Sequence, residues 1–156
     1  MYLDTAIMVK LLVREPESRW FDSALAGQRF ETSELSLTEV QSALLAKERR
    51  GFISARERTT AGKKFQSMVD EEIVRLLPLN RRTVERANAI QAACHPGIGL
   101  RTLDALHVAT CDLHHCGTLS TTDTQMRAAC RQFAIALLPV RLEEVTRDGD
   151  LTGLPA

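Results

Sequence analysis

The feature that most constrains this fold is the alternation of short, strand-like apolar runs with longer helical segments. Strands are predicted over residues 1–4, 28–32, 73–77, 118–121 and 133–140. Helices are predicted between them, over 5–14, 17–26, 36–50, 55–70, 82–94, 101–115 and 123–130. Alternating strands and helices favour a parallel sheet with helices packed on its faces. The pattern therefore predicts an α/β fold with a mainly parallel central sheet.

Length and charge narrow the function classes. A chain of 156 residues corresponds to one domain. Its 20 Lys and Arg balance 20 Asp and Glu, which excludes a strongly basic protein that coats nucleic acid but not an enzyme that grips nucleic acid through metal ions. Aromatic residues make up only 4% of the chain, so a platform that stacks single-stranded bases is disfavoured.

The sequence also bears on location and redox state. No run approaches the ~20 apolar residues of a membrane span, and the N-terminus lacks the basic start of a secretory signal. These features predict a cytoplasmic protein with no membrane partner. The four cysteines show no CxxC spacing, which in this compartment indicates reduced thiols.

Four acidic residues stand at the ends of predicted elements. Asp4 ends the first strand, and Asp123 follows the fourth. Glu39 and Asp104 each lie in the first turn of a predicted helix. Ligands of open parallel sheets bind in the groove outside the carboxyl ends of the strands. If these elements share that edge of the sheet, four carboxylates converge there.

Each acid, taken singly, also has a structural explanation. Ser36 and Glu39 have the spacing of a capping box, in which the glutamate bonds back to the helix start. Asp104 and Asp123 would complement helix dipoles, an effect of about 0.3–1 kcal/mol each, and Asp4 would cap the following turn. Against this, Asp4 and Asp104 lie in apolar stretches, where an unpaired carboxylate is costly to bury.

Converging carboxylates have a characteristic use. Like charges held close together raise each other's pKa unless a cation lies between them. Mg²⁺ and Mn²⁺ prefer oxygen ligands and so relieve the repulsion. A bound divalent ion can activate water and neutralise the charge of a phosphodiester, which requires no protein nucleophile. The four acids therefore suggest metal-dependent hydrolysis of a phosphodiester.

The sequences around these acids resemble a known family. Asp4 and Thr5 in YLDTAIMVKLLVREPES, Glu39 in SLTEVQSALLAKERRG, Asp104 in LRTLDALHVAT and Asp123 in LSTTDTQM resemble the four acidic motifs of PIN-domain ribonucleases, and most closely those of VapC-like toxins. The resemblance spans residues 1–140 and leaves 141–156 as a C-terminal tail. It implies a three-layer α/β/α sandwich around a parallel sheet.

The resemblance implies an activity and a set of site residues. The activity is endonucleolytic cleavage of RNA, with Mg²⁺ or Mn²⁺ held by Asp4, Glu39, Asp104 and Asp123. Thr5 and Thr121 match family hydroxyls that help to orient the acids. Ala6 departs from the serine of many relatives, which removes a hydroxyl beside Asp4 but no metal ligand.

The same resemblance implies partners. These are an RNA substrate, a second copy of the chain in a homodimer, and a cognate antitoxin that inserts a helix or arm into the active-site groove. Trp20 and Phe21 would either line that groove or pack in the core.

A basic stretch offers a second candidate surface. Between Lys47 and Lys64 there are seven Lys and Arg residues against two Glu. Such a run is either a solvated helical hairpin or a rim that faces phosphates. The candidate RNA-binding residues are Lys47, Arg49, Arg50, Lys63 and Lys64.

Other functions are open but fit less well. A receiver-type signalling domain needs paired acids after the first strand, and a D-x-D phosphatase needs an acid at position 6; this chain has Thr5 and Ala6. A non-catalytic PIN-like module that binds RNA or protein would keep the fold without catalysis, but all four acids are present in this chain. A zinc site on the 101–115 helix is disfavoured because Asp104 and Cys111 lie about 10 Å apart along the helix. His107 is then expected to be a packed or supporting residue.

Overall fold

The centre of the molecule is a five-stranded sheet. The computed structural model describes residues 1–146. Its strands are β1 (Tyr2–Leu3), β2 (Phe30–Ser33), β3 (Val74–Leu77), β4 (Thr118–Ser120) and β5 (Ala136–Leu138). They lie in the order β3-β2-β1-β4-β5, and each neighbouring pair is parallel. The predicted parallel sheet is confirmed, with the first strand in the middle.

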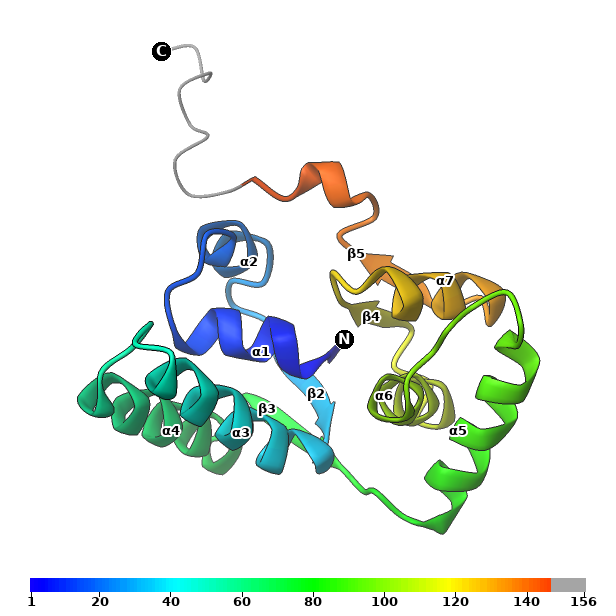
Figure 1. Cartoon of the computed structure of the whole chain (residues 1–156), viewed down its shortest axis with the longest axis horizontal. Coiled ribbons are helices and arrows are strands. Elements are labelled where there is room, and N and C mark those ends of the chain that lie inside the picture. The colour runs from blue at the N-terminus through cyan, green and yellow to red at the C-terminus, as the bar shows by residue number, and fades with distance from the viewer. Residues whose placement is uncertain (147–156) are drawn as a thin grey trace.

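Helices cover both faces of the sheet. They are α1 (Thr5–Leu12), α2 (Ser18–Ala24), α3 (Leu35–Arg49), α4 (Ala55–Asp70), α5 (Arg81–Cys94), α6 (Thr102–Leu113) and α7 (Thr124–Gln132). Figure 1 shows α1–α4 on one side of the sheet and α5–α7 on the other. This is the predicted α/β/α sandwich. Within residues 1–146, no helix combines the length and apolar character needed to cross a membrane.

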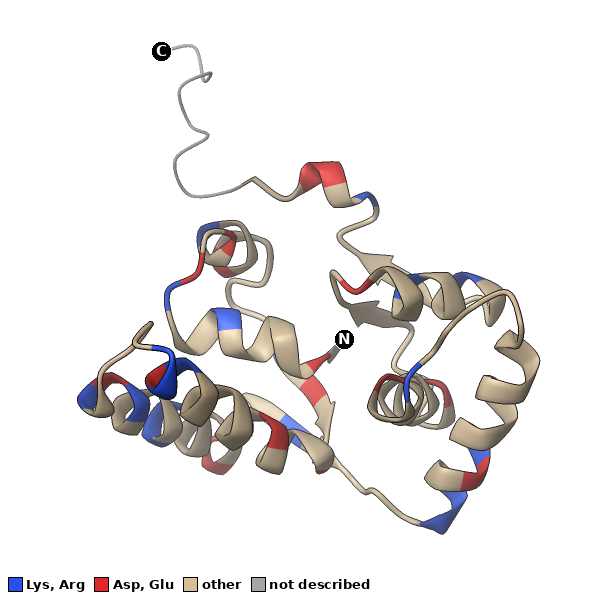
Figure 2. Ribbon diagram, viewed as in Figure 1, with Lys and Arg blue, Asp and Glu red and all other residues tan. Residues whose placement is uncertain are grey.

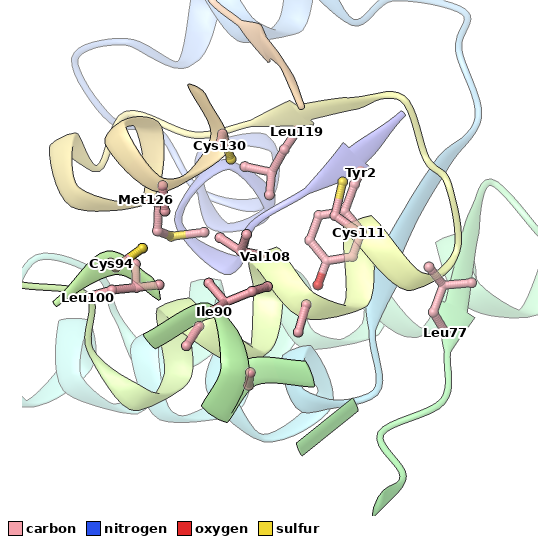
Figure 3. Packing of buried hydrophobic residues seen from close by; sticks show 14 residues of the cluster. Tyr2, Leu77, Ile90, Cys94, Leu100, Val108, Cys111, Leu119, Met126 and Cys130 are labelled. Atoms are coloured by element: carbon pink, nitrogen blue, oxygen red, sulfur yellow. The ribbon is translucent and has the colours of Figure 1, made fainter. Parts of the chain in front are cut away.

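Two hydrophobic cores hold the layers together. Strand β1 shows the division, because successive side chains of a strand point to opposite faces. Tyr2 packs in the core beneath α5, α6 and α7, among Ile90, Val108 and Leu119 (Figure 3). Leu3 packs in the core beneath α1–α4. The central strand is thus buried on both sides, which explains its continuous apolar sequence.

The element boundaries differ from the sequence predictions in two informative places. The last strand, predicted over 133–140, is only Ala136–Leu138. Phe133 is the C-cap of α7, and Pro139 has no amide hydrogen to donate to a neighbouring strand. Helix α3 begins at Leu35, one residue before Ser36, which therefore lies inside the helix.

The tail predicted over 141–156 lies only partly within the described residues. Leu142–Glu144 form a single 3₁₀ turn, and Val145 packs against the core beneath α1–α4. Residues 147–156 lie outside the described part of the chain.

A buried arginine joins the ends of β4 and β5. Arg127 is 1% exposed, although it lies on α7. Its Nη1 donates to the carbonyls of Thr121 (3.0 Å) and Pro139 (2.9 Å), and its Nη2 donates to the carbonyl of Val140 (2.9 Å). Arg127 therefore fixes the connection from β4 to α7, on which Asp123 lies. The burial of Arg127 could not be predicted from the sequence, because an arginine on a short helix is usually exposed.

Candidate active site

Asp4 leaves the carboxyl end of the central strand and begins α1. Its backbone amide donates to the carbonyl of Ser120 at the end of β4 (3.2 Å). Its Oδ1 accepts a hydrogen bond from the amide of Ile7 (2.8 Å), which makes it the N-cap of α1. The residue is 4% exposed. Asp4 thus lies buried at the sheet edge where the groove of a parallel sheet is expected.

Asp123 occupies the equivalent place after β4. Its Oδ1 accepts from the amides of Gln125 (2.9 Å) and Met126 (2.8 Å) at the start of α7. Its own amide donates to the hydroxyl of Thr121 (3.0 Å). The hydroxyl of Thr121 therefore fixes the turn that carries Asp123.

Asp4 and Asp123 each cap a helix through Oδ1. The structural explanation of each residue is correct, since both cap helices. Because a carboxylate has two oxygens, capping by Oδ1 leaves Oδ2 able to accept other partners. Helix capping and cation binding are compatible for these side chains.

Electrostatics connect three of the four acids. Burial raises the pKa of Asp4, and the negative charge of Asp123 raises it further, against hydrogen bonds from Thr121 and Ile7. Burial also raises the pKa of Asp104, and Asp123 again adds to the rise. Asp123 therefore lies within electrostatic reach of both other aspartates. This mutual repulsion is what a cation at the sheet edge would relieve.

Glu39 differs from the aspartates in its partners. Its Oε2 accepts a hydrogen bond from the hydroxyl of Thr5 (2.5 Å) and lies 2.7 Å from Nε2 of His107. Burial by itself would raise the pKa of Glu39, but the interactions with His107 and Thr5 outweigh it and lower that pKa. Glu39 is therefore held as a carboxylate, connected to α1 through Thr5 and to α6 through His107.

The capping-box interpretation of Ser36 and Glu39 is wrong. The N-cap of α3 is Glu34, which makes no side-chain capping bond. Ser36 is buried, and its hydroxyl hydrogen-bonds with those of Thr32 (2.7 Å) and Thr5 (3.1 Å). Glu39 points to α1 and α6 instead of back to the helix start. Its position is therefore not explained by local capping.

The donor chemistry of these acids suits a hard cation, although no site is assembled in full. Within residues 1–146, no three His, Cys, Asp or Glu side chains are close enough to form a metal-binding group. The negative charge of Asp123 raises the pKa of both Asp4 and Asp104. His107 interacts electrostatically with the same two aspartates and contacts Glu39, so it connects Glu39 to them. Carboxylate oxygens are the ligands that hard divalent cations such as Mg²⁺ and Mn²⁺ prefer.

His107 is more central than the sequence indicated. It was expected to be a packed or supporting residue, and it is indeed buried, with 3% exposure. It also hydrogen-bonds through both ring nitrogens, to Tyr2 and to Glu39. The available signal was its position three residues after Asp104, which places both side chains on one face of α6.

A groove adjoins Glu39 on the α1–α3 side. It has a volume of about 460 Å³, and its floor is mainly apolar. Thr5 and Glu39 lie in its lining, and Ala6, Val9 and Leu103 supply apolar surface. The lining also contains the ion-paired side chains of Glu15 and Lys47.

Trp20 and Phe21 pack edge to face (4.9 Å), and Phe21 is fully buried, so this pair belongs to the core.

The basic residues lie on the α3–α4 hairpin. Figure 2 shows them concentrated at the end of the hairpin away from the N-terminus. Arg49, Arg50, Lys63 and Lys64 are exposed. Lys47 pairs with Glu15, and Nζ of Lys64 donates to the carbonyl of Leu11 (2.6 Å). The hairpin is therefore a charged, solvated surface on which some cations already have partners.

Comparisons with known proteins agree with this arrangement. The PIN domain family model matches residues 1–132. Ribonuclease VapC46 of Mycobacterium tuberculosis is 35% identical over 144 residues, which cover 88% of this chain and 95% of the relative.

Two solved structures share the fold. One is VapC20 of Mycobacterium tuberculosis, described as a sarcin-ricin loop cleaving toxin, with a TM-score of 0.62, 18% identity, and coverage of 82% of this chain and 93% of that chain. The other is a toxin-antitoxin complex from Klebsiella pneumoniae, with a TM-score of 0.56, 17% identity, and coverage of 81% and 89%.

Proposed function

The chain belongs to the PIN domain family, and on this basis we propose that it is an endoribonuclease that acts as the toxin of a toxin–antitoxin pair. The observation that carries the proposal is the position of Asp4 and Asp123, which begin helices at the carboxyl ends of the paired strands β1 and β4, at one edge of the sheet. That edge lies in a chain that is 35% identical to a ribonuclease along 88% of its length.

The proposed metal ligands are Asp4, Asp104, Asp123 and Glu39, with Asp4 and Asp104 central. A bound Mg²⁺ or Mn²⁺ supplies Lewis-acid activation of water and neutralises phosphodiester charge. The protein's own contribution is positional. Thr121 holds the turn that carries Asp123, and Thr5 holds one oxygen of Glu39.

Chelation tests this function directly. The purified chain should cleave a structured RNA when Mn²⁺ or Mg²⁺ is present, lose cleavage in EDTA, and regain it when excess ion is added back. The physical reason is that carboxylates alone repel the phosphodiester they must approach. Product formation is measured on a gel with end-labelled RNA. Undiminished cleavage in EDTA would contradict metal dependence, and RNA binding without cleavage in either ion would favour the non-catalytic module.

We extend the proposal to partners. The groove beside Glu39 is apolar along its floor and polar at the site, which suits an antitoxin segment that reaches the acids. One structural neighbour is described as a toxin-antitoxin complex. A homodimer is proposed as well, on the family resemblance. Light scattering of the purified chain, alone and with the product of a neighbouring small gene, measures both assemblies.

The basic hairpin should contribute to RNA affinity and not to the chemical step. Replacing Lys63 and Lys64 by Gln is expected to reduce the salt slope of single-stranded RNA binding by up to about 1.4, since each phosphate contact contributes about 0.7. Cleavage at saturating RNA should stay unchanged. The measurement is the dissociation constant at several salt concentrations. Arg81 and Arg82 on α5 are exposed too, and their Gln variants serve as the control. An unchanged salt slope in the variant with Lys63 and Lys64 replaced would contradict the proposal that the basic hairpin contacts RNA phosphates.

A further inference from the structure

A continuous chain of hydrogen bonds runs from the core to Glu39. The backbone amide of Ser33 donates to the hydroxyl of Tyr2 (3.2 Å). That hydroxyl lies 2.6 Å from Nδ1 of His107, and Nε2 of His107 lies 2.7 Å from Oε2 of Glu39. The chain links the end of β2 to β1, then to α6 and finally to α3. Tyr2 and His107, its two middle members, are buried.

The direction of each hydrogen bond follows from the groups present. An ionised glutamate can only accept, so Nε2 of His107 carries a proton and donates it to Oε2. In a neutral ring Nδ1 is then an acceptor, to which the hydroxyl of Tyr2 donates, whereas in a charged ring Nδ1 donates to that hydroxyl; Nε2 donates to Glu39 in both forms. That hydroxyl accepts in turn from Ser33. Every member therefore has a partner of the right kind, as a buried polar network requires.

Both hydrogen bonds of Glu39 end on the same oxygen. Thr5 and His107 meet at Oε2, from α1 and α6 respectively. Two donors from different helices fix the rotation of the carboxylate, because a single donor would leave it free to turn. Oε1 receives neither of these donors, and Glu39 lies in the lining of the groove between α1 and α3.

We propose that His107 is a positioning residue that, supported by Tyr2, holds Oε2 of Glu39 so that Oε1 serves as the metal ligand. This inference rests on the proposed function, in which Glu39 binds the ion. A histidine that merely fills the core would need only its shape, and its ring does pack edge to face against Tyr2 (5.8 Å). Packing alone does not require hydrogen bonds at both nitrogens.

The first test reads the proton on the ring in ion-free protein. Long-range ¹H–¹⁵N NMR of the ¹⁵N-labelled chain in EDTA reports the protonation of each ring nitrogen, and the His107→Gln spectrum assigns the signal. We expect Nε2 of His107 to be protonated, and Tyr2→Phe to shift the Nδ1 resonance. An Nε2 without a proton would overturn the proposal, since it could not donate to Glu39.

The second test measures Mn²⁺ binding by calorimetry without RNA. His107→Leu removes both hydrogen bonds and should weaken Mn²⁺ binding by about 10-fold or more, the usual loss when a group that orients a ligand is removed. His107→Gln can still donate at the Nε2 position and should recover most of the affinity. The control is His114→Leu at the exposed C-cap of the same helix, which should bind like the wild type.

The outcomes separate this proposal from the function on which it rests. Wild-type Mn²⁺ affinity in folded His107→Leu, or equal losses in the Leu and Gln variants, would overturn the role of His107 alone. A wild-type chain that neither binds Mn²⁺ nor cleaves RNA would instead overturn the proposed function. If His107→Leu does not fold, Tyr2→Phe decides, because it removes one oxygen and keeps the ring. Reduced Mn²⁺ affinity then supports the proposal, and unchanged affinity overturns it.

Discussion

Replacing Asp104 or Asp4 by asparagine should abolish RNA cleavage in a protein that remains folded. Each change removes one negative charge from the proposed cation site while keeping the side-chain shape. We expect cleavage to fall by at least about 10²–10³-fold, the loss typical when one charge-stabilising group is removed from a reacting centre. Initial rates at saturating Mn²⁺ and RNA measure it.

The Asp4→Asn variant is expected to fold at least as stably as the wild type in the absence of metal. Asparagine retains Oδ1, so the amide of Ile7 keeps its capping partner. Because burial raises the pKa of Asp4, its carboxylate is less favourable in the folded chain than in the unfolded one. That penalty is absent below the ordinary pKa of Asp, about 3.9, and grows as pH rises through the raised folded pKa. In EDTA at pH 7, Asp4→Asn should therefore be at least as stable as the wild type.

Urea unfolding in EDTA measures the unfolding free energy of both proteins. The stability advantage of Asp4→Asn over the wild type should shrink as pH falls toward 4. The control for activity is Asp22→Asn, which changes an exposed acid on α2 and should cleave RNA normally. A folded Asp104→Asn protein that cleaves RNA at the wild-type rate would remove Asp104 from the site.

Replacing Arg127 by methionine should cause a large loss of stability. Three carbonyls, of Thr121, Pro139 and Val140, would lose the donor they now share. The bonds to Thr121 and Pro139 are buried, and a buried acceptor left without a partner costs about 1–3 kcal/mol, so we expect a loss of at least about 2 kcal/mol. In a domain of this size that lowers the melting temperature by roughly 4–8 °C.

Differential scanning calorimetry measures the effect. Arg131→Met, an exposed position on the same helix, is the control and should change the unfolding free energy by less than about 0.5 kcal/mol. Equal melting temperatures for the wild type and Arg127→Met would show that water replaces the guanidinium without cost.

The Asp4 and Asp123 side chains show why a sequence motif can support two readings at once. Capping and cation binding looked like alternatives in the sequence. The structure shows both residues capping helices through Oδ1, and the second oxygen leaves cation binding possible. Their place at strand ends was predictable because strands and helices follow local periodicity. The electrostatic coupling of Asp123 to Asp104 was not, since it depends on how β4 and α6 pack.

The sequence by itself determined the alternation of strands and helices, the parallel sheet, and the positions of Asp4, Asp104 and Asp123 at the ends of its elements. Each of these follows from side-chain patterns over a few neighbouring residues. The predicted position of Glu39 in the first turn of its helix is wrong, because α3 begins at Leu35 and Glu39 lies one turn further along. Only the tertiary structure decided that Ser36 is buried, that Arg127 joins the ends of two strands, and that His107 connects Tyr2 to Glu39. Those partners lie as far as 105 positions apart in the chain. Local patterns carry no record of such contacts, because packing of whole helices against the sheet creates them.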